Sequence, residues 1–248
     1  MPHAGTAPYN AFGHCAAPCR FFLRRITTYR LSIFQAPRAD DRIGPLFIAR
    51  AIPIMTILML AGSPSRQSRS SALLRYAARR LAARGLASGE LGLHDLPAED
   101  LIEARHDGAA AAALRRRVAA AQALLIATPV YKASFAGGLK AILDLLDEKA
   151  LADKVVLPIA TGGTSAHLLA VEYGLKPVLS ALGARHILAG VYATDRQVAL
   201  QGEEVAIDGD VRLRLDTAVD HLCSQLASGP PAQGYDLGYL ALKARFSI

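Results

Sequence analysis

Residues 56–71 read TILMLAGSPSRQSRSS, a short apolar run that leads directly into a loop rich in serine and arginine. Residues 56–61 lack the polar–apolar alternation of a half-exposed strand, which is typical of a strand buried on both faces of a sheet. Residues 71–83 then place Leu73, Leu74, Ala77 and Leu81 on one helical stripe. A buried strand, a polar loop and an amphipathic helix in this order predict the start of an α/β fold.

The same alternation of strands and helices continues along the chain. Further strands are expected at 91–93, 123–128 (ALLIAT), 154–160 (KVVLPIA) and 185–192. Helices are expected at 97–105, 109–121, 137–146, 166–182 (interrupted at Pro177) and 211–226. Because parallel strands are joined by helical crossovers, this order predicts an α/β fold with a doubly wound, five-stranded parallel sheet and helices on both faces.

The chain divides into three parts, of which residues 55–227 carry this pattern. Residues 1–54 show no sustained periodicity and are rich in Arg and poor in acids. We expect them to be a start-site artefact upstream of Met55 or, as the weaker alternative, an organelle transit peptide. Residues 228–248 contain Pro230, Pro231 and several Gly, and we interpret them as a C-terminal tail with a candidate role in subunit contact.

Charge and cysteine usage exclude several classes of function. Residues 1–54 contribute +5 of the formal net charge of +7, so the remainder is too close to neutral for a nucleic-acid-binding body. No apolar run reaches the roughly 18 residues that a membrane helix requires. His14, Cys15 and Cys19 lack a fourth zinc ligand at usable spacing, and the three cysteines indicate no disulfide framework. We therefore expect no metal, no membrane segment and a cytoplasmic protein.

The loop at 62–71 has the composition of a phosphate site. Ligands of doubly wound sheets bind beyond the carboxyl ends of the strands, where this loop is expected to lie. A phosphate dianion needs several donors and favours a helix N-terminus. The charge would come from Arg66 or Arg69, and the hydroxyls from Ser63, Ser68, Ser70 and Ser71. The alternative is an ordinary polar loop in which Ser70 caps the helix.

Two further loops follow the strands at 123–128 and 154–160. TPVYKASF (128–135) offers Tyr131 as a flat surface and backbone groups for a flavin ring, although a rigid turn with a half-buried tyrosine is an equal alternative. TGGTSAH (161–167) contains paired glycines, which let a ligand approach the backbone without a Cβ clash. A lone histidine at a helix start, such as His167, more often makes a structural hydrogen bond than acts as a general acid. Hydride transfer to a flavin would also require no protein acid.

Four stretches resemble, in order and spacing, the NADPH-dependent FMN reductases of two-component alkanesulfonate monooxygenase systems: LAGSPSRQSRSSALL, IATPVYKASFAGGLKAILDLL, KVVLPIATGGTSAHLLAVEYGLKPVLSALGA and GVYATDRQV. The resemblance covers about residues 55–226. It implies a flavodoxin-like fold in a homo-dimer or homo-tetramer. It also implies that NADPH reduces FMN, and that reduced FMN is released to a separate flavin-dependent monooxygenase that cleaves a sulfonate.

The resemblance assigns roles to particular residues. It implies that the FMN phosphate is held by Ser63, Ser68, Arg69, Ser70 and Ser71. It implies that the flavin is lined by Pro129, Val130, Tyr131 and Lys132, and is bordered on its other side by Thr161, Gly162 and Gly163. The relatives carry Tyr where this chain has Phe135, in a helix with an inserted residue that meets a neighbouring subunit. The missing hydroxyl would then affect FMN retention and the oligomer.

We therefore predict an NAD(P)H-dependent FMN reductase with FMN and NADPH as its cofactors. A quinone or azo reductase with tightly bound FMN would use the same loops and remains an alternative. A non-catalytic flavodoxin-like electron carrier is a third possibility. It ranks last, because such carriers are strongly acidic and the chain beyond residue 54 carries a formal charge of only +2.

Overall fold

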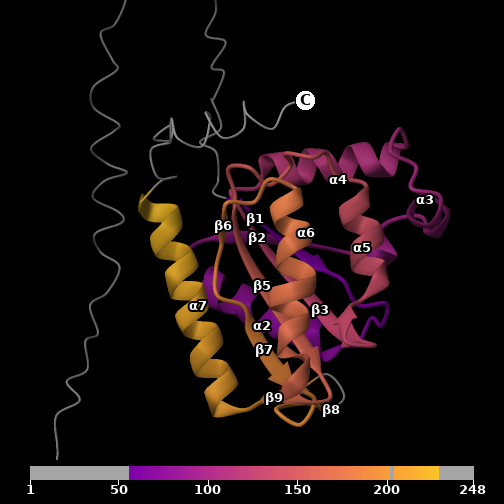
Figure 1. Ribbon diagram of the computed structural model, residues 1–248. Helices are drawn as coiled ribbons and strands as arrows, with labels where there is room; N and C mark the ends of the chain where they lie inside the picture. The colour runs from indigo at the N-terminus through magenta and orange to yellow at the C-terminus, as the bar shows by residue number, and fades with distance from the viewer. Residues whose placement is uncertain (1–55, 202–203, 229–248) are drawn as a thin grey trace, which may run out of the picture. The chain divides into compact units, whose positions relative to one another are not determined.

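The computed structural model describes residues 56–201 and 204–228, so the expected extension at 1–54 and the tail beyond residue 228 lie outside the described residues. The described chain folds around a central sheet (Figure 1). Its parallel strands run in the order β2–β1–β3–β5, and β6 and β7 follow at the edge beside β5. They span Thr56–Ala61 (β1), Ala87–Gly92 (β2), Ala123–Tyr131 (β3), Val155–Gly162 (β5), His186–Ile187 (β6) and Val191–Thr194 (β7). This order confirms the predicted doubly wound, flavodoxin-like sheet.

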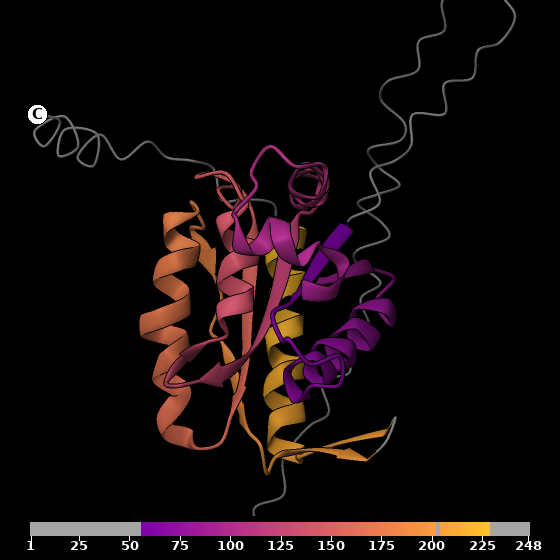
Figure 2. The ribbon, with the colours of Figure 1, turned by 90° about the vertical axis from the view of Figure 1, so that its right-hand side faces the viewer.

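Helices cover both faces of the sheet, as the edge-on view of Figure 2 shows. One face carries α2 (Arg69–Ala82) and α7 (Gly209–Ser228), and the other carries α4 (Ala109–Ala120), α5 (Gly137–Asp144) and α6 (Lys176–Ala181). Side chains alternate along a strand, so Ile57 enters the core under α2 and Leu58 enters the core under α4. Two buried faces explain why the sequence of β1 is apolar without a break.

The expectation of one strand at 185–192 is wrong, because the edge is divided into β6 and β7. The N–H of Leu188 donates to the carbonyl of Val156, so the polar groups of Val156 face this edge. Because backbone polar groups alternate in direction along a strand, the carbonyl of Pro158, two residues further along β5, faces the same edge. Proline has no N–H to donate, and the ladder is interrupted where Gly190 approaches the Pro158 ring.

The segment expected to be a helix at 166–182 consists of three pieces. A 3-10 turn, η2 (Ser165–Leu168), is followed by a wide π-helical turn, η3 (Ala170–Leu175), and then by α6. Pro177 lies in the first turn of α6, where a missing N–H costs nothing. The irregular turns therefore precede Pro177, and the proline itself is accommodated.

The expected position of Phe135 in a helix is also wrong. Phe135 belongs to the short strand β4 (Ser134–Phe135), which pairs antiparallel with the end of β3. The helix with the wide turn is η3, which includes Tyr173. Phe135 lies against η3, since a Cβ placed on Gly174 would be 3.6 Å from Phe135 Cδ1. A hydroxyl in the wide-turn helix is therefore supplied by Tyr173, and Phe135 does not remove it.

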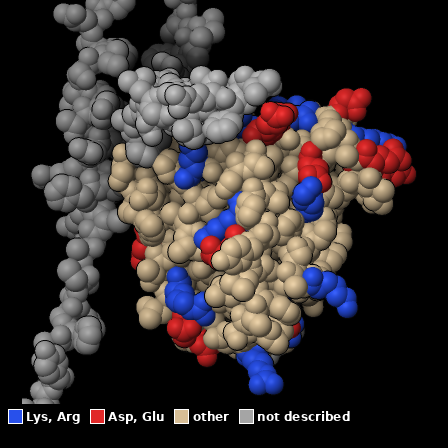
Figure 3. Space-filling model, viewed as in Figure 1, with Lys and Arg blue, Asp and Glu red and all other residues tan. Residues whose placement is uncertain are grey.

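The remaining elements lie at the margins of the sheet. A hairpin of β8 (Val198–Gln201) and β9 (Glu204–Ile207), which was not expected, follows β7 and projects at one end of the fold (Figure 2). The short helices η1 (Leu93–Asp95) and α3 (Ala98–Ile102) precede α4. No helix within 56–201 or 204–228 has the length and apolar character needed to cross a membrane. On the face in Figure 3, Lys and Arg are scattered among acidic and uncharged residues.

Candidate flavin site

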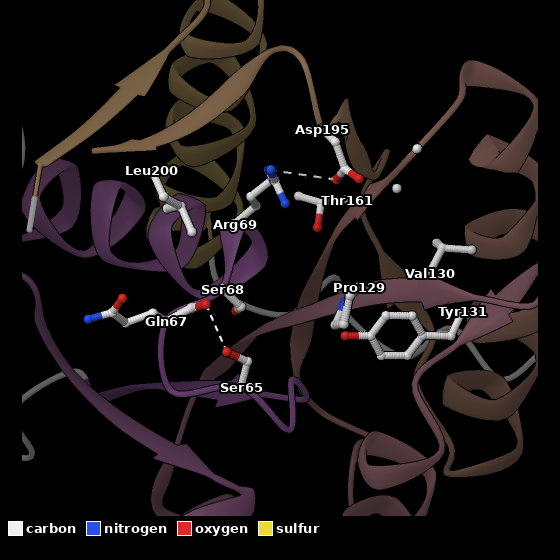
Figure 4. A pocket seen from close by; sticks show the side chains of 12 residues that line it. Ser65, Gln67, Ser68, Arg69, Pro129, Val130, Tyr131, Thr161, Asp195 and Leu200 are labelled. Atoms are coloured by element: carbon white, nitrogen blue, oxygen red, sulfur yellow. Dashed lines mark hydrogen bonds and ion pairs between the residues drawn. The ribbon is translucent and has the colours of Figure 1, made fainter. Parts of the chain in front are cut away.

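The carboxyl ends of β3 and β5 and the loops that follow β1, β5 and β7 lie at one edge of the sheet and line one pocket (Figure 4). The cavity measures about 260 Å³ and is open to solvent on one side. Its walls are formed by Ser65, Gln67, Ser68, Arg69, Pro129, Val130, Tyr131, Thr161, Gly162, Gly163, Asp195 and Leu200. Doubly wound sheets bind ligands at this edge, so the pocket is the candidate functional site.

Ser68 caps the N-terminus of α2, so the alternative in which Ser70 is the cap is wrong. The Oγ of Ser68 accepts the N–H of Ser71 at 3.1 Å, and its hydroxyl donates to the Oγ of Ser71 at 2.8 Å. Ser70 and Ser71 are buried beneath the cap. The first N–H groups of a helix have no acceptor within the helix. Together with the positive end of the helix dipole, they make this terminus suitable for a phosphate.

The loop before α2 is held by its own hydrogen bonds and by a neighbouring element. The buried Oγ of Ser63 accepts the N–H of Ser65 at 3.1 Å, and the Ser65 hydroxyl donates to the carbonyl of Gln67 at 2.8 Å. From η1, the Nε2 of His94 lies 2.9 Å from the carbonyl oxygen of Pro64. The loop is therefore organised before any ligand binds.

Arg69 reaches the pocket from the first turn of α2, whereas Arg66 does not line it. Its Nε donates to the carbonyl of Val198 at 3.0 Å, which ties α2 to the β8–β9 hairpin. The same Nε lies 3.9 Å from Asp195 Oδ1. Both side chains are more than 40% exposed, so this ion pair adds little to stability.

The hairpin of β3 and β4 presents Tyr131 to the pocket. Lys132 and Ala133 form the turn, with φ values of 50° and 62°, a region that favours glycine. Thr128 braces the hairpin, because its hydroxyl accepts the N–H of Ala136 at 3.0 Å. The Tyr131 side chain is 51% exposed and offers part of its ring to a ligand.

The paired glycines at the end of β5, Gly162 and Gly163, differ in their surroundings. A Cβ on Gly162 would lie 2.5 Å from the Oη of Tyr192, whereas a Cβ on Gly163 would meet no atom of the described chain within 4 Å. The Tyr192 hydroxyl donates to the carbonyl of Thr164 at 2.6 Å and so supports the loop from below. Burial, followed by the charge of Asp195, raises the pKa of Tyr192, so the phenol remains a protonated donor at neutral pH.

The structure brings eight of the twelve sequence-predicted site residues to the pocket wall: Ser68, Arg69, Pro129, Val130, Tyr131, Thr161, Gly162 and Gly163. The side chains of Ser63, Ser70 and Ser71 are turned into the fold, and Lys132 is exposed on the turn beside the pocket. Four lining residues were not predicted: Ser65, Gln67, Asp195 and Leu200. Asp195 directly follows β7, so the same strand-end rule could have identified it.

The residues of this pocket fit a flavin mononucleotide. The serine cap and the helix N-terminus suit a phosphate, and Tyr131 suits a flat ring. Gly163 leaves open space above the loop backbone, so a ring can approach it closely. One side of the pocket therefore matches the anionic end of FMN, and the other matches its aromatic end.

Comparisons with known proteins agree with this geometry. Residues 55–199 match the family described as NADPH-dependent FMN reductase. The chain is 49% identical over 166 residues to the FMN reductase (NADPH) of Escherichia coli (strain K12), covering 67% of this chain and 87% of the relative. It is 52% identical over 145 residues to the FMN reductase (NADPH) of Pseudomonas putida (strain KT2440), covering 58% and 74%.

Among solved structures, the fold is similar to that of apo NADH:FMN oxidoreductase (EMOB). The TM-score is 0.62 at 38% identity, and the match covers 68% of this chain and 88% of that one. A doubly wound sheet, a pocket at its carboxyl edge and a family match over more than half of the sequence lead to one conclusion: the chain belongs to the NADPH-dependent FMN reductase family.

Proposed function

We propose that this chain uses NAD(P)H to reduce FMN and releases the reduced FMN to a separate flavin-dependent monooxygenase in sulfonate desulfonation. The reaction class follows from membership of the family. The desulfonation role rests on the sequence resemblance to alkanesulfonate systems. The observation that carries the proposal is one open pocket in which a helix N-terminus suited to an anion, an aromatic ring and a loop backbone without side-chain cover converge.

In this proposal each wall of the pocket has a separate task. The α2 N-terminus, Ser68 and Arg69 hold the phosphate, while Pro129, Val130 and Tyr131 line the ring. Thr161, Gly162 and Gly163 border the other side of the ring. Ser63, Ser70 and Ser71 act through the shape of the loop, because their side chains are buried. Lys132 is exposed on the turn beside the pocket, where its positive charge can attract the phosphates of the nicotinamide nucleotide.

FMN supplies the redox chemistry when it is bound, because it accepts a hydride from NADPH and leaves as reduced FMN. The protein therefore has to orient two flat ligands and does not need an acid or base. His167 fits this view, since it lies in η2 and does not line the pocket. The half-exposed Tyr131 and the open side of the cavity leave room for a nicotinamide ring and for exchange of FMN with solvent.

The proposal is tested by following NADPH oxidation, through the loss of nicotinamide absorbance, with and without added FMN. We expect turnover that saturates with free FMN and protein that loses its flavin on dialysis. No FMN-dependent rate would contradict the enzyme assignment. Protein that stays yellow and reduces quinones or azo dyes with ping-pong kinetics would instead support the alternative reductase.

We also propose that the chain forms a homo-dimer or homo-tetramer. Three large apolar side chains from the segment of η2 and η3 are exposed, namely Leu168, Leu169 and Tyr173. In the same segment, the Nδ1 of His167 is buried without a hydrogen-bond partner among the described residues. A second copy of the chain would cover the apolar groups. Light scattering that reports a monomer at micromolar concentration would contradict this expectation.

A further inference from the structure

The charges along the pocket wall oppose one another. Of the lining residues, Arg69 carries the positive charge and Asp195 carries the negative charge. The two side chains lie next to each other in Figure 4, and the distance from Arg69 Nε to Asp195 Oδ1 is 3.9 Å. The wall as a whole is therefore close to neutral, although its proposed ligand bears a dianionic phosphate.

Arg69 is not free to turn fully toward a phosphate. Its Nε is held by the carbonyl of Val198, and Asp195 draws the guanidinium toward β7. A phosphate that binds at the N-terminus of α2 has to share this cation with the carboxylate. It also enters the field of a like charge, which weakens binding in a partly exposed site.

The Asp195 carboxylate is not required to hold the backbone in place. The backbone N–H of Asp195 donates to the carbonyl of Gly162 at 2.9 Å, and this bond does not involve the side chain. The side chain itself is 45% exposed. The carboxylate lines the pocket, and its charge also contributes to the raised pKa of the neighbouring Tyr192, after the larger effect of burial.

We propose that Asp195 sets an upper limit on the affinity for FMN by competing with the flavin phosphate for Arg69. This inference rests on the proposed function, in which FMN is a substrate that must leave. A reductase that supplies a separate oxygenase gains from rapid exchange of its flavin. A carboxylate beside the phosphate site would speed FMN dissociation without weakening the contacts between the pocket and the flavin ring.

The test measures the binding of FMN and of riboflavin to wild-type protein and to Asp195→Asn. The two ligands differ only by the phosphate. Asparagine keeps the shape and removes the charge. We expect Asp195→Asn to lower the Kd of FMN by about three- to tenfold, the range for removal of one partly exposed like charge, and to slow FMN dissociation correspondingly. The Kd of riboflavin should not change. Raising the salt concentration should shrink the difference between the two proteins.

Two further variants complete the design. Asp195→Glu retains the charge and should not tighten FMN. Asp144→Asn removes a carboxylate that pairs with Lys140 at the end of α5, outside the pocket wall, and should leave both ligands unaffected. Equal FMN affinity in wild type and Asp195→Asn, weaker FMN in the variant, or equal tightening of riboflavin would overturn the inference. Wild-type protein that binds neither ligand would instead overturn the proposed function.

Discussion

Replacement of Gly162 by alanine probes the support beneath the flavin loop. The added Cβ would lie 2.5 Å from the Oη of Tyr192 and 3.3 Å from the Cβ of Val130. The Tyr192 side chain cannot simply swing away, because Tyr192 is 6% exposed and belongs to a buried cluster with Val130 and Ala170. The methyl group must therefore displace either the tyrosine or the loop.

The loss of stability in Gly162→Ala follows from one contact that is compressed and one hydrogen bond that is lost. Overpacking a buried site costs about 1–3 kcal/mol. Movement of the Tyr192 hydroxyl also breaks its 2.6 Å bond to Thr164, which is worth about 1 kcal/mol. We expect Gly162→Ala to lower the free energy of unfolding by about 2–4 kcal/mol. FMN affinity should fall as well, since the loop borders the proposed ring site.

A double-mutant cycle isolates the clash. Tyr192→Phe removes the hydroxyl and should cost about 1 kcal/mol by itself. In that background the nearest remaining tyrosine-ring atom lies at 3.5 Å, an ordinary contact, so Gly162→Ala should become milder by about 1–2 kcal/mol. Urea denaturation followed by circular dichroism measures each corner of the cycle. Additive effects, within about 0.5 kcal/mol, would refute the reasoning.

Three other predictions follow from the same geometry. Gly163→Ala should leave the thermal midpoint unchanged, because its Cβ meets no atom of the described chain within 4 Å. It should nevertheless raise the Kd of FMN, and an unchanged Kd would show that the flavin ring does not lie against this loop. Ser68→Ala should lower the free energy of unfolding by about 1 kcal/mol through loss of the cap on Ser71, and should also weaken FMN; a change in stability with full FMN affinity would leave Ser68 with a capping role only. Burial raises the folded-state pKa of Tyr192 above its ordinary value of 10.0, so its contribution to stability is complete below pH 10.0 and is lost as the pH rises through the folded-state pKa. Denaturation at about pH 9 and about pH 11 should show a smaller alkaline loss in Tyr192→Phe than in wild type, with Tyr76→Phe as a second variant because the pKa of Tyr76 is also raised; equal losses in all three proteins would contradict this account.

The central strands were predictable because burial on both faces leaves a simple signal. Residues 123–128 are all buried, so the run ALLIAT carries no alternation and reads as a strand. The edge strand β2 (Ala87–Gly92) has one buried residue, Leu91, and its polar sequence supplied too little signal to place its start. The two prolines act differently from what local sequence predicts, since Pro158 divides an edge strand that lies far away in the sequence, and Pro177 does not break its own helix.

The strand-end rule located the site, but it did not give the directions of the side chains. Ser68 and Arg69 face the pocket, whereas Ser70 and Ser71 face the core one residue later, because successive helical positions turn by about 100°. Leu200 reaches the pocket only through the β8–β9 hairpin, a tertiary arrangement that no local pattern indicates. Loop composition therefore predicts the kind of ligand, and the packing decides which side chains line the pocket.

The central claim is that one pocket, at the carboxyl edge of the sheet, holds both the phosphate and the ring of FMN. A crystal structure of the protein with FMN tests this claim most directly. We expect the phosphate at the N-terminus of α2 beside Ser68 and Arg69, and the ring between Tyr131 and the backbone of Gly163. FMN bound elsewhere, or bound in this pocket with its phosphate directed away from α2, would contradict the account.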